Sequence, residues 1–179
     1  YWRAPPCTGA HVNAGRMNIH FSHSQTHQRG AANYRCSGEV DALRLPKEGF
    51  YAHQVMWDGW VDPERPRLHI VGHWNYAAGV KKPVYVVSSA EKSARFLYTW
   101  KEVAFQAGAV RAVGADAGGR RLCEATIKTA GAPAALRLTP RTGPEGLRAD
   151  GADLALVDVE VVDAQGQRCP TARNAVTFS

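Results

Sequence analysis

The 179-residue sequence contains no apolar run long enough to cross a bilayer as a helix, which needs about 20 residues. It has no CxxC pair either, because its four cysteines are scattered along the chain: Cys7, Cys36, Cys123 and Cys169. A zinc site is therefore not expected, although an even number of cysteines allows disulfides. The first residues, YWRAPPCTG, lack the basic start and apolar stretch of a signal peptide. These absences argue against a membrane partner.

Basic residues form no stripe along the chain. The formal net charge is +6, but Lys and Arg occur singly or in short pairs such as Lys81-Lys82. Nucleic-acid-binding proteins usually cluster such residues on one face, so nucleic acid is not an expected partner. Hydrophobic residues make up 45% of the chain and charged residues 21%, which excludes a disordered protein and allows one medium domain or two small ones.

The first 60 or so residues are rich in His, Asn, Ser, Trp and Tyr and contain two predicted elements. One is a strand over Met17–Ser22, MNIHFS. The other is a helix that begins near Pro46, because proline is favoured in the first helical turn and Glu48 complements the helix dipole there. We expect the Asp58-Gly59 pair to end this helix.

From about residue 64, apolar residues recur with a period of two, which predicts strands. The strands are short and separated by turn residues, as in a β-sandwich, and DAGG (Asp116–Gly119) is a predicted hairpin turn. Lys128–Ala134 has the composition of a linker, after which the strand pattern restarts and contains another turn, DAQGQ. The sequence stops within a predicted strand, VTFS, which would leave an unpaired sheet edge. We therefore expect this chain to be a piece of a longer protein.

Several motifs together resemble a known family. FYAHQVMWDGW, PRLHIVGHWNY and KKPVYVVSSAE, which include Gln54–Trp57 and His73–Tyr76, are similar to the C-terminal side of β-galactosidase-like family 2 glycoside hydrolases. The resemblance implies a mainly β fold, in which immunoglobulin-like β-sandwiches follow the last strand and helix of a (β/α)8 barrel. It implies three parts: residues 1–62 from the end of the catalytic barrel, residues 63–131 as one sandwich, and residues 132–179 as the first strands of a second.

Two departures from the family pattern matter. Members usually have a hairpin with a Leu-Asn-Gly-type turn after the strand that VSSAEK matches, whereas Lys92 here runs directly into SARFLYTW. Either the protein lacks this hairpin, or the protein has it and its residues were left out of the sequence. In addition, the acid/base glutamate of the family follows an asparagine, and this chain has no Asn-Glu dipeptide. We therefore expect no catalytic residue here and no activity from the isolated chain.

The resemblance implies that the parent protein is a retaining, exo-acting glycoside hydrolase that cleaves terminal β-linked sugars and has both catalytic glutamates outside this segment. Its expected partners are a carbohydrate substrate and the remainder of the barrel in the same chain. We further expect no cofactor, a possible homo-oligomer, and a periplasmic or secreted location in a bacterium. The alternative is a non-catalytic immunoglobulin-like module for carbohydrate binding or adhesion.

The polar stretch Ser22–Arg35, SHSQTHQRGAANYR, is the predicted substrate-binding region. If Met17–Ser22 is the last barrel strand, this loop lies at the C-terminal end of that strand, where (β/α)8 barrels have their active sites. Its imidazoles, amides, hydroxyls and guanidiniums are suited to sugar hydroxyls. The candidate residues are His23, Ser24, Gln25, His27, Asn33 and Arg35. Such residues also cap turns in ordered loops, so a purely structural role stays open.

Arg29 and Arg35 allow two interpretations. A guanidinium binds a carboxylate through two parallel hydrogen bonds, which would fit a uronic acid substrate. The same geometry would fit an ion pair with a carboxylate elsewhere in the barrel, and the sequence does not distinguish the two.

Other residues are interpreted as structural. His69 and His73 are expected on one strand face at i and i+4, but no further ligands accompany them, so we predict no metal site. We interpret the acidic residues near the end of the predicted helix as solvated turn residues: Asp58, Asp62 and Glu64. Four tryptophans are expected to pack at the junction of the helix and the sandwich: Trp57, Trp60, Trp74 and Trp100.

Overall fold

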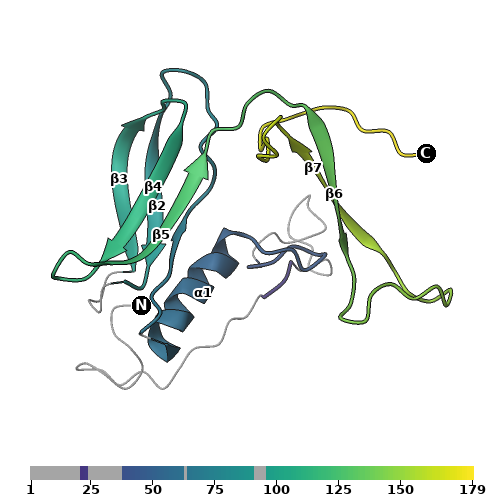
Figure 1. The fold of residues 1–179 in the computed structure, drawn as a ribbon, viewed down its shortest axis with the longest axis horizontal. Helices are drawn as coiled ribbons and strands as arrows, with labels where there is room; N and C mark the ends of the chain where they lie inside the picture. The colour runs from purple at the N-terminus through teal and green to yellow at the C-terminus, as the bar shows by residue number, and fades with distance from the viewer. Residues whose placement is uncertain (1–20, 24–37, 63, 91–95) are drawn as a thin grey trace, which may run out of the picture. The chain divides into compact units, whose positions relative to one another are not determined.

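The computed structural model describes residues 21–23, 38–62, 64–90 and 96–179 of the chain. As expected, the fold is mainly β with one helix (Figure 1). The described residues form two compact units that interleave along the sequence. Unit 1 contains the described residues up to 72 together with 80–104 and 110–127, and unit 2 contains residues 73–79, 105–109 and 128–179. The elements in chain order are α1 (Glu48–Val61), β1 (Leu68–Ile70), β2 (Lys81–Ser88), β3 (Leu97–Ala104), β4 (Ala109–Ala115), β5 (Arg121–Lys128), β6 (Ala135–Arg141) and β7 (Leu156–Val162).

Helix α1 begins where the sequence predicts and ends later. Lys47 is the N-cap, and the helix runs through Val61 rather than ending at Asp58-Gly59. The reason is tertiary packing: a β-carbon at Gly59 would overlap the side chain of Ser89, so the glycine permits close contact inside the helix instead of terminating it. Among the described residues, no helix combines the length and apolarity of a membrane span.

The first sheet of unit 1 is antiparallel, with the strand order β1-β2-β3. Its ladder is irregular at Pro83, which has no N–H to donate: Lys82 pairs with Val103, but Val84 pairs with Trp100. β3 therefore bulges, and Glu102 takes a left-handed conformation with φ of 54°.

The two faces of this sheet have different neighbours. On one face, Val87 of β2 packs against Val55 and Met56 of α1, and this cluster is the core of unit 1. Burial of such side chains stabilises the fold by roughly 1.5–3 kcal/mol each. On the other face, Val84 and Val86 border a cleft that β4 closes from the opposite side.

β4 and β5 form a separate two-stranded hairpin. The predicted turn at Asp116–Gly119 is confirmed: Asp116 N–H donates to Arg120 O at 3.0 Å, and Gly119 has a φ of 81°. The Asp116 carboxylate accepts the N–H groups of Arg120 and Gly118, and the hydrogen bonds from the Arg120 backbone and side chain are the main reason that its pKa is lowered.

Unit 2 contains the antiparallel hairpin β6–β7. The second predicted turn, DAQGQ, is also confirmed, because Asp163 N–H bonds Gln167 O at 2.9 Å. The predicted strand at VTFS is wrong, since residues 172–179 carry no strand. Only two residues of the predicted strand Met17–Ser22 are described; Ser22 makes a single parallel bridge to Val40, and the rest lies outside the described residues.

Candidate functional site

The polar stretch that begins at Ser22 is anchored by a short backbone bridge. Val40 N–H donates to Phe21 O at 3.0 Å, and His23 N–H donates to Val40 O at 3.2 Å. Val40 is only 2% exposed. Because this bridge is buried, the position of His23 at the start of the stretch is fixed by the packing beneath it.

The ring of His23 lies within a small cluster of polar groups. Gly38 N–H donates to His23 Nδ1 at 3.3 Å, so this nitrogen carries the lone pair. Lys47 Nζ lies 3.4 Å from His23 Nε2 and donates to Gly38 O at 2.8 Å. An ammonium and an imidazole side by side present N–H groups and positive charge, which suit a carboxylate or a hydroxyl.

Glu39 ties the same cluster to α1. Its carboxylate pairs with His53 Nδ1, and its backbone O accepts Lys47 N–H at 2.9 Å. The Glu39 side chain is 13% exposed, so this carboxylate is largely withdrawn from solvent and matched by an imidazole. The arrangement holds Gly38–Val40 against the start of the helix.

An apolar groove lies beside this cluster on α1. Its lining includes Phe21, Phe50, Met56 and Trp57, and its volume is about 340 Å³. Trp57 is 64% exposed and Phe21 is 49% exposed. Single exposed apolar residues are common, whereas here four apolar side chains border one groove together with Glu39, His53, Gln54 and Asp58.

Of the six predicted binding residues, the structure describes only His23. The other five lie outside the described residues: Ser24, Gln25, His27, Asn33 and Arg35. Lys47, Glu39 and His53 were missed by the sequence interpretation. Lys47 lies 24 positions from His23, and no periodic pattern links the two.

His69 and His73 do not share a strand, which corrects the expectation. β1 ends at Ile70 because the chain turns at Gly72, where φ is 87°. His69 instead bonds Glu48 at 2.6 Å and stacks on Tyr51 with ring centroids 4.9 Å apart. The hydrogen bond from His69 is the main reason that the pKa of Glu48 is lowered. The described residues contain no cluster of three metal ligands.

The other structural interpretations are only partly correct. Asp58 lies inside α1 and bonds Arg67 at 2.8 Å, so it is not a turn residue. Trp74 is packed, at 5% exposed. Trp57 and Trp100 are each more than half exposed, so the prediction that these two side chains are packed is wrong. The side chain of Trp60 lies outside the described part of the chain.

The motif His73–Tyr76 organises unit 2. The Asn75 amide donates to Ala130 O at 3.3 Å and accepts Ala130 N–H at 3.2 Å. Trp74 Nε1 donates to Gln106 O at 3.0 Å, and Thr129 Oγ1 donates to Trp74 O at 2.8 Å. These residues therefore join three chain segments and serve the fold rather than a ligand.

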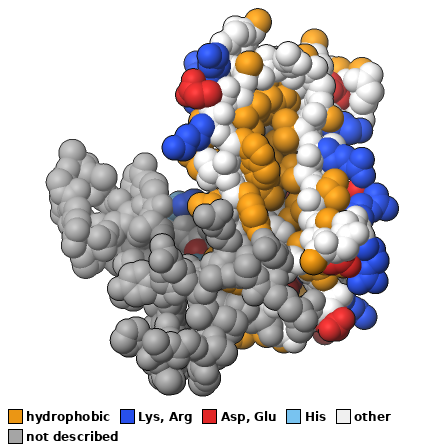
Figure 2. Space-filling view, turned by 90° about the vertical axis from the view of Figure 1, so that its left-hand side faces the viewer, with side chains coloured by type: hydrophobic (Ala, Val, Ile, Leu, Met, Phe, Trp, Pro, Cys, Tyr) orange, Lys and Arg blue, Asp and Glu red, His pale blue; other side chains and the backbone are white. Residues whose placement is uncertain are grey.

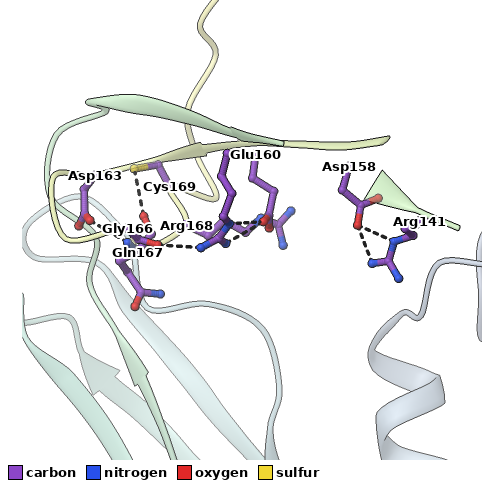
Figure 3. A network of polar contacts seen from close by, with 9 residues as sticks. Arg141, Asp158, Glu160, Asp163, Gly166, Gln167, Arg168 and Cys169 are labelled. Atoms are coloured by element: carbon purple, nitrogen blue, oxygen red, sulfur yellow. Dashed lines mark hydrogen bonds and ion pairs between the residues drawn. The ribbon is translucent and has the colours of Figure 1, made fainter. Parts of the chain in front are cut away.

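One face of the β6–β7 hairpin carries a ladder of ion pairs (Figure 3). Glu160 accepts Arg137 at 2.7 Å and lies 3.6 Å from Arg168, and Arg141 bonds Asp158 at 2.6 Å. Every carboxylate in this ladder has a guanidinium partner within the hairpin or its turn. The ladder is a charged surface with three guanidiniums and two carboxylates, so it has a small positive excess.

Comparison with known proteins explains these motifs. The sequence profile described as glycoside hydrolase family 2 C-terminal domain 5 matches residues 136–179. The predicted resemblance is confirmed: the chain is a C-terminal segment of a glycoside hydrolase family 2 protein.

Two curated relatives are similar over most of the chain. The β-glucuronidase of Formosa agariphila is 46% identical over 161 residues, which is 81% of this chain and 16% of the relative. A β-galactosidase of Bacteroides ovatus is 32% identical over 159 residues, which is 79% of this chain and 18% of the relative. The chain thus spans less than a fifth of either protein. A solved family 2 β-glucuronidase structure matches with a TM-score of 0.67 at 44% identity, over 78% of this chain and 16% of that one.

Proposed function

We propose that the chain is part of a retaining, exo-acting glycoside hydrolase that removes terminal β-linked sugars, and that these sugars are β-glucuronides. The observation that carries this proposal is the 46% identity over 161 residues to a protein named as a β-glucuronidase. In a retaining enzyme, one glutamic acid protonates the leaving oxygen and a second attacks the anomeric carbon. Both glutamates belong to parts of the parent protein outside this segment.

The segment contributes structure around that chemistry. Residues 1–62 complete the (β/α)8 barrel with its last strand and with α1, and residues 63–131 and 132–179 belong to successive immunoglobulin-like sandwiches. The exposed apolar groove beside Trp57 supports this assignment, because the preceding barrel helix and strands would cover it.

The cluster at His23 and Lys47 then lies at the rim of the sugar pocket, with the remaining candidates between Ser24 and Arg35. A glucuronide has a carboxylate at C6 where a galactoside has a hydroxymethyl group, and the two sugars also differ in configuration at C4. The Lys47 ammonium supplies the charge that complements the carboxylate. A charge-assisted hydrogen bond contributes about 1.5–3 kcal/mol, or roughly a tenfold to hundredfold preference.

The test is a comparison of kcat/KM for aryl β-glucuronides and aryl β-galactosides with the intact parent protein. We expect the glucuronide to be preferred, and we expect the isolated 179-residue chain to give no turnover on either. Preference for the galactoside would overturn the substrate assignment, and no turnover by the parent would favour a non-catalytic binding module.

The Lys47→Met variant of the parent separates binding from folding. If Lys47 contacts the sugar carboxylate, kcat/KM falls at least roughly tenfold for the glucuronide and much less for the galactoside. Because Lys47 also bonds Gly38 O, a purely structural role would lower both values by the same factor.

A further inference from the structure

Unit 1 has two openings, and they differ in the groups that line them. The larger one, of about 540 Å³, is mainly apolar, and Figure 2 shows apolar side chains gathered in a hollow band on the side of the molecule where Figure 1 labels β3 and β4. Among the described residues, Arg111 is the one charged residue of its lining, and it is paired with Glu124. The smaller groove on α1 is lined by two carboxylates and an imidazole as well as by apolar side chains. Chemically active groups therefore line the smaller groove, beside the cluster of His23 and Lys47.

Glu39 lies against one face of α1 and contacts the helix at three positions. Its backbone O accepts Lys47 N–H at 2.9 Å, and its carboxylate pairs with His53 Nδ1. Its side chain packs beside Gly49, where a β-carbon would lie 3.6 Å from Glu39 Cγ. Because Lys47 and His53 are six residues apart, these contacts span about 9 Å of the helix axis. Contacts at both ends of that distance fix the direction of the Glu39 segment as well as its position.

The residues on either side of Glu39 hold the two candidate sugar contacts that the structure describes. Gly38 N–H donates to His23 Nδ1 at 3.3 Å, and Gly38 O accepts Lys47 Nζ at 2.8 Å. Val40 O accepts His23 N–H at 3.2 Å. Residues 38–40 therefore set the separation of 3.4 Å between Lys47 Nζ and His23 Nε2. A shift of this segment would move the imidazole and the ammonium together.

The side chains of Glu39 and His53 belong to the groove rather than to the cluster. Both residues line the groove on α1, whereas His23 and Lys47 are not among the described residues of its lining. The Glu39 carboxylate is largely withdrawn from solvent, and a buried charge that loses its partner is strongly unfavourable. The ion pair therefore keeps Glu39 seated on α1, and any effect of the pair on a sugar passes through the backbone of residues 38–40.

We infer that Glu39 is a positioning residue for recognition of the sugar carboxylate. Its ion pair with His53 fixes residues 38–40 on α1 and thereby places Lys47 Nζ and the ring of His23 for the substrate. This inference rests on the proposed function, in which Lys47 binds the carboxylate of a β-glucuronide. The preference for a glucuronide then depends on two side chains that do not contact the sugar.

The first test measures kcat/KM of the intact parent protein on aryl β-glucuronides and aryl β-galactosides. Glu39→Ala should lower the glucuronide value roughly tenfold, mainly through KM, and the galactoside value by no more than about twofold. Glu39→Gln should restore most of the preference, because its amide oxygen can still accept an N–H from His53. Asp58→Asn is the matched control, since Asp58 lines the same groove but pairs with Arg67, and it should leave the preference unchanged.

A double-mutant cycle tests whether Glu39 acts through Lys47. If it does, adding Glu39→Ala to Lys47→Met should change the glucuronide kcat/KM by less than about twofold, whereas independent effects would multiply. Multiplying effects would overturn the inference. An equal loss on both substrates in Glu39→Ala would also overturn it, because that pattern indicates a purely structural role.

Hydrogen–deuterium exchange of the parent protein separates failure of this inference from failure of the proposed function, because it needs no substrate. The backbone N–H groups of Gly38, Val40 and Lys47 are hydrogen-bonded in the folded chain. In Glu39→Ala, the peptide that covers residues 38–47 should exchange roughly tenfold faster, and in Asp58→Asn it should exchange as in the wild type. Unchanged exchange in Glu39→Ala would refute the positioning role. Faster exchange in a parent that does not prefer glucuronides would refute the substrate assignment and, with it, the role in recognition of the carboxylate.

Discussion

Gly38 lies where two backbone segments, residues 21–23 and 38–40, approach closely, and no other residue type fits there. A β-carbon at this position would lie 2.5 Å from His23 N and 2.7 Å from Val40 O. Both neighbours are backbone atoms, which cannot move aside as a flexible side chain can. The close approach lets Gly38 N–H reach the imidazole of His23.

The Gly38→Ala substitution should therefore destabilise unit 1 by roughly 1–3 kcal/mol, the usual cost of overpacking. The measurement is the urea unfolding midpoint. Gly49→Ala is a matched control, because its β-carbon would meet nothing closer than 3.6 Å and it lies in α1. That substitution should stabilise the chain by roughly 0.5–1 kcal/mol, and effects of the same sign would contradict the packing argument.

Asp163 is a buried carboxylate held by backbone groups. It is 5% exposed and accepts the N–H groups of Gly131 at 2.7 Å, Gln167 at 2.8 Å and Gln165 at 2.9 Å. The bond from Gly131 is the largest of the effects that lower the pKa of Asp163 below its ordinary value of 3.8. Because the folded state favours the ionised form, this contribution to stability is present above pH 3.8 and is lost as the pH falls through the lower folded-state pKa.

The Asp163→Asn variant should unfold at lower urea concentration than the wild type at neutral pH. The difference should shrink as the pH falls below 3.8, because the protonated wild-type carboxyl then resembles the amide. Midpoints measured at a series of pH values test this. Asp62→Asn, in the exposed turn after α1, should leave the pH profile unchanged, and a pH-independent difference for Asp163→Asn would refute the assignment.

At the scale of elements, sequence reasoning succeeded where local chemistry decides the structure. The turns at Asp116–Gly119 and at Asp163 were predictable, because aspartate and glycine favour them through their own backbone and side-chain preferences. The end of α1 was not predictable, because the contact of Gly59 with Ser89 involves residues 30 positions apart. The cluster of His23 with Lys47 was missed for the same reason.

The pair of hydrogen bonds between Asn75 and Ala130 is the tertiary contact that best explains the motif His73–Tyr76. Asn75→Ala removes both hydrogen bonds to Ala130 and leaves two partly buried backbone groups without this partner. We expect unit 2 to lose roughly 1–3 kcal/mol in its free energy of unfolding. Asn174→Ala, at an exposed asparagine of the same unit, should change stability by no more than about 0.5 kcal/mol. If urea unfolding showed comparable losses of the free energy of unfolding for the two variants, the role given to the Asn75 hydrogen bonds would be contradicted.

At the scale of the whole molecule, the resemblance predicted the family and the mainly β fold class from the motifs around Gln54–Trp57 and His73–Tyr76. It did so because those residues have specific structural contacts, such as Asn75 with Ala130 and Met56 with Val87. The strand expected at VTFS failed because β-propensity without a pairing partner does not determine a strand. The exposed state of Trp57 and Trp100 was also unpredictable, since composition does not reveal which apolar surfaces the chain leaves open.

The contact between Asn75 and Ala130 fastens together two backbone positions that are 55 residues apart. The chain between them carries β2 to β5, including the Val87 side chain that packs against α1, so it forms a closed loop whose two ends are held at one place. An insertion in the exposed turn between β4 and β5 would lengthen this loop without moving its ends, so that turn is where a protein engineer can add a foreign domain.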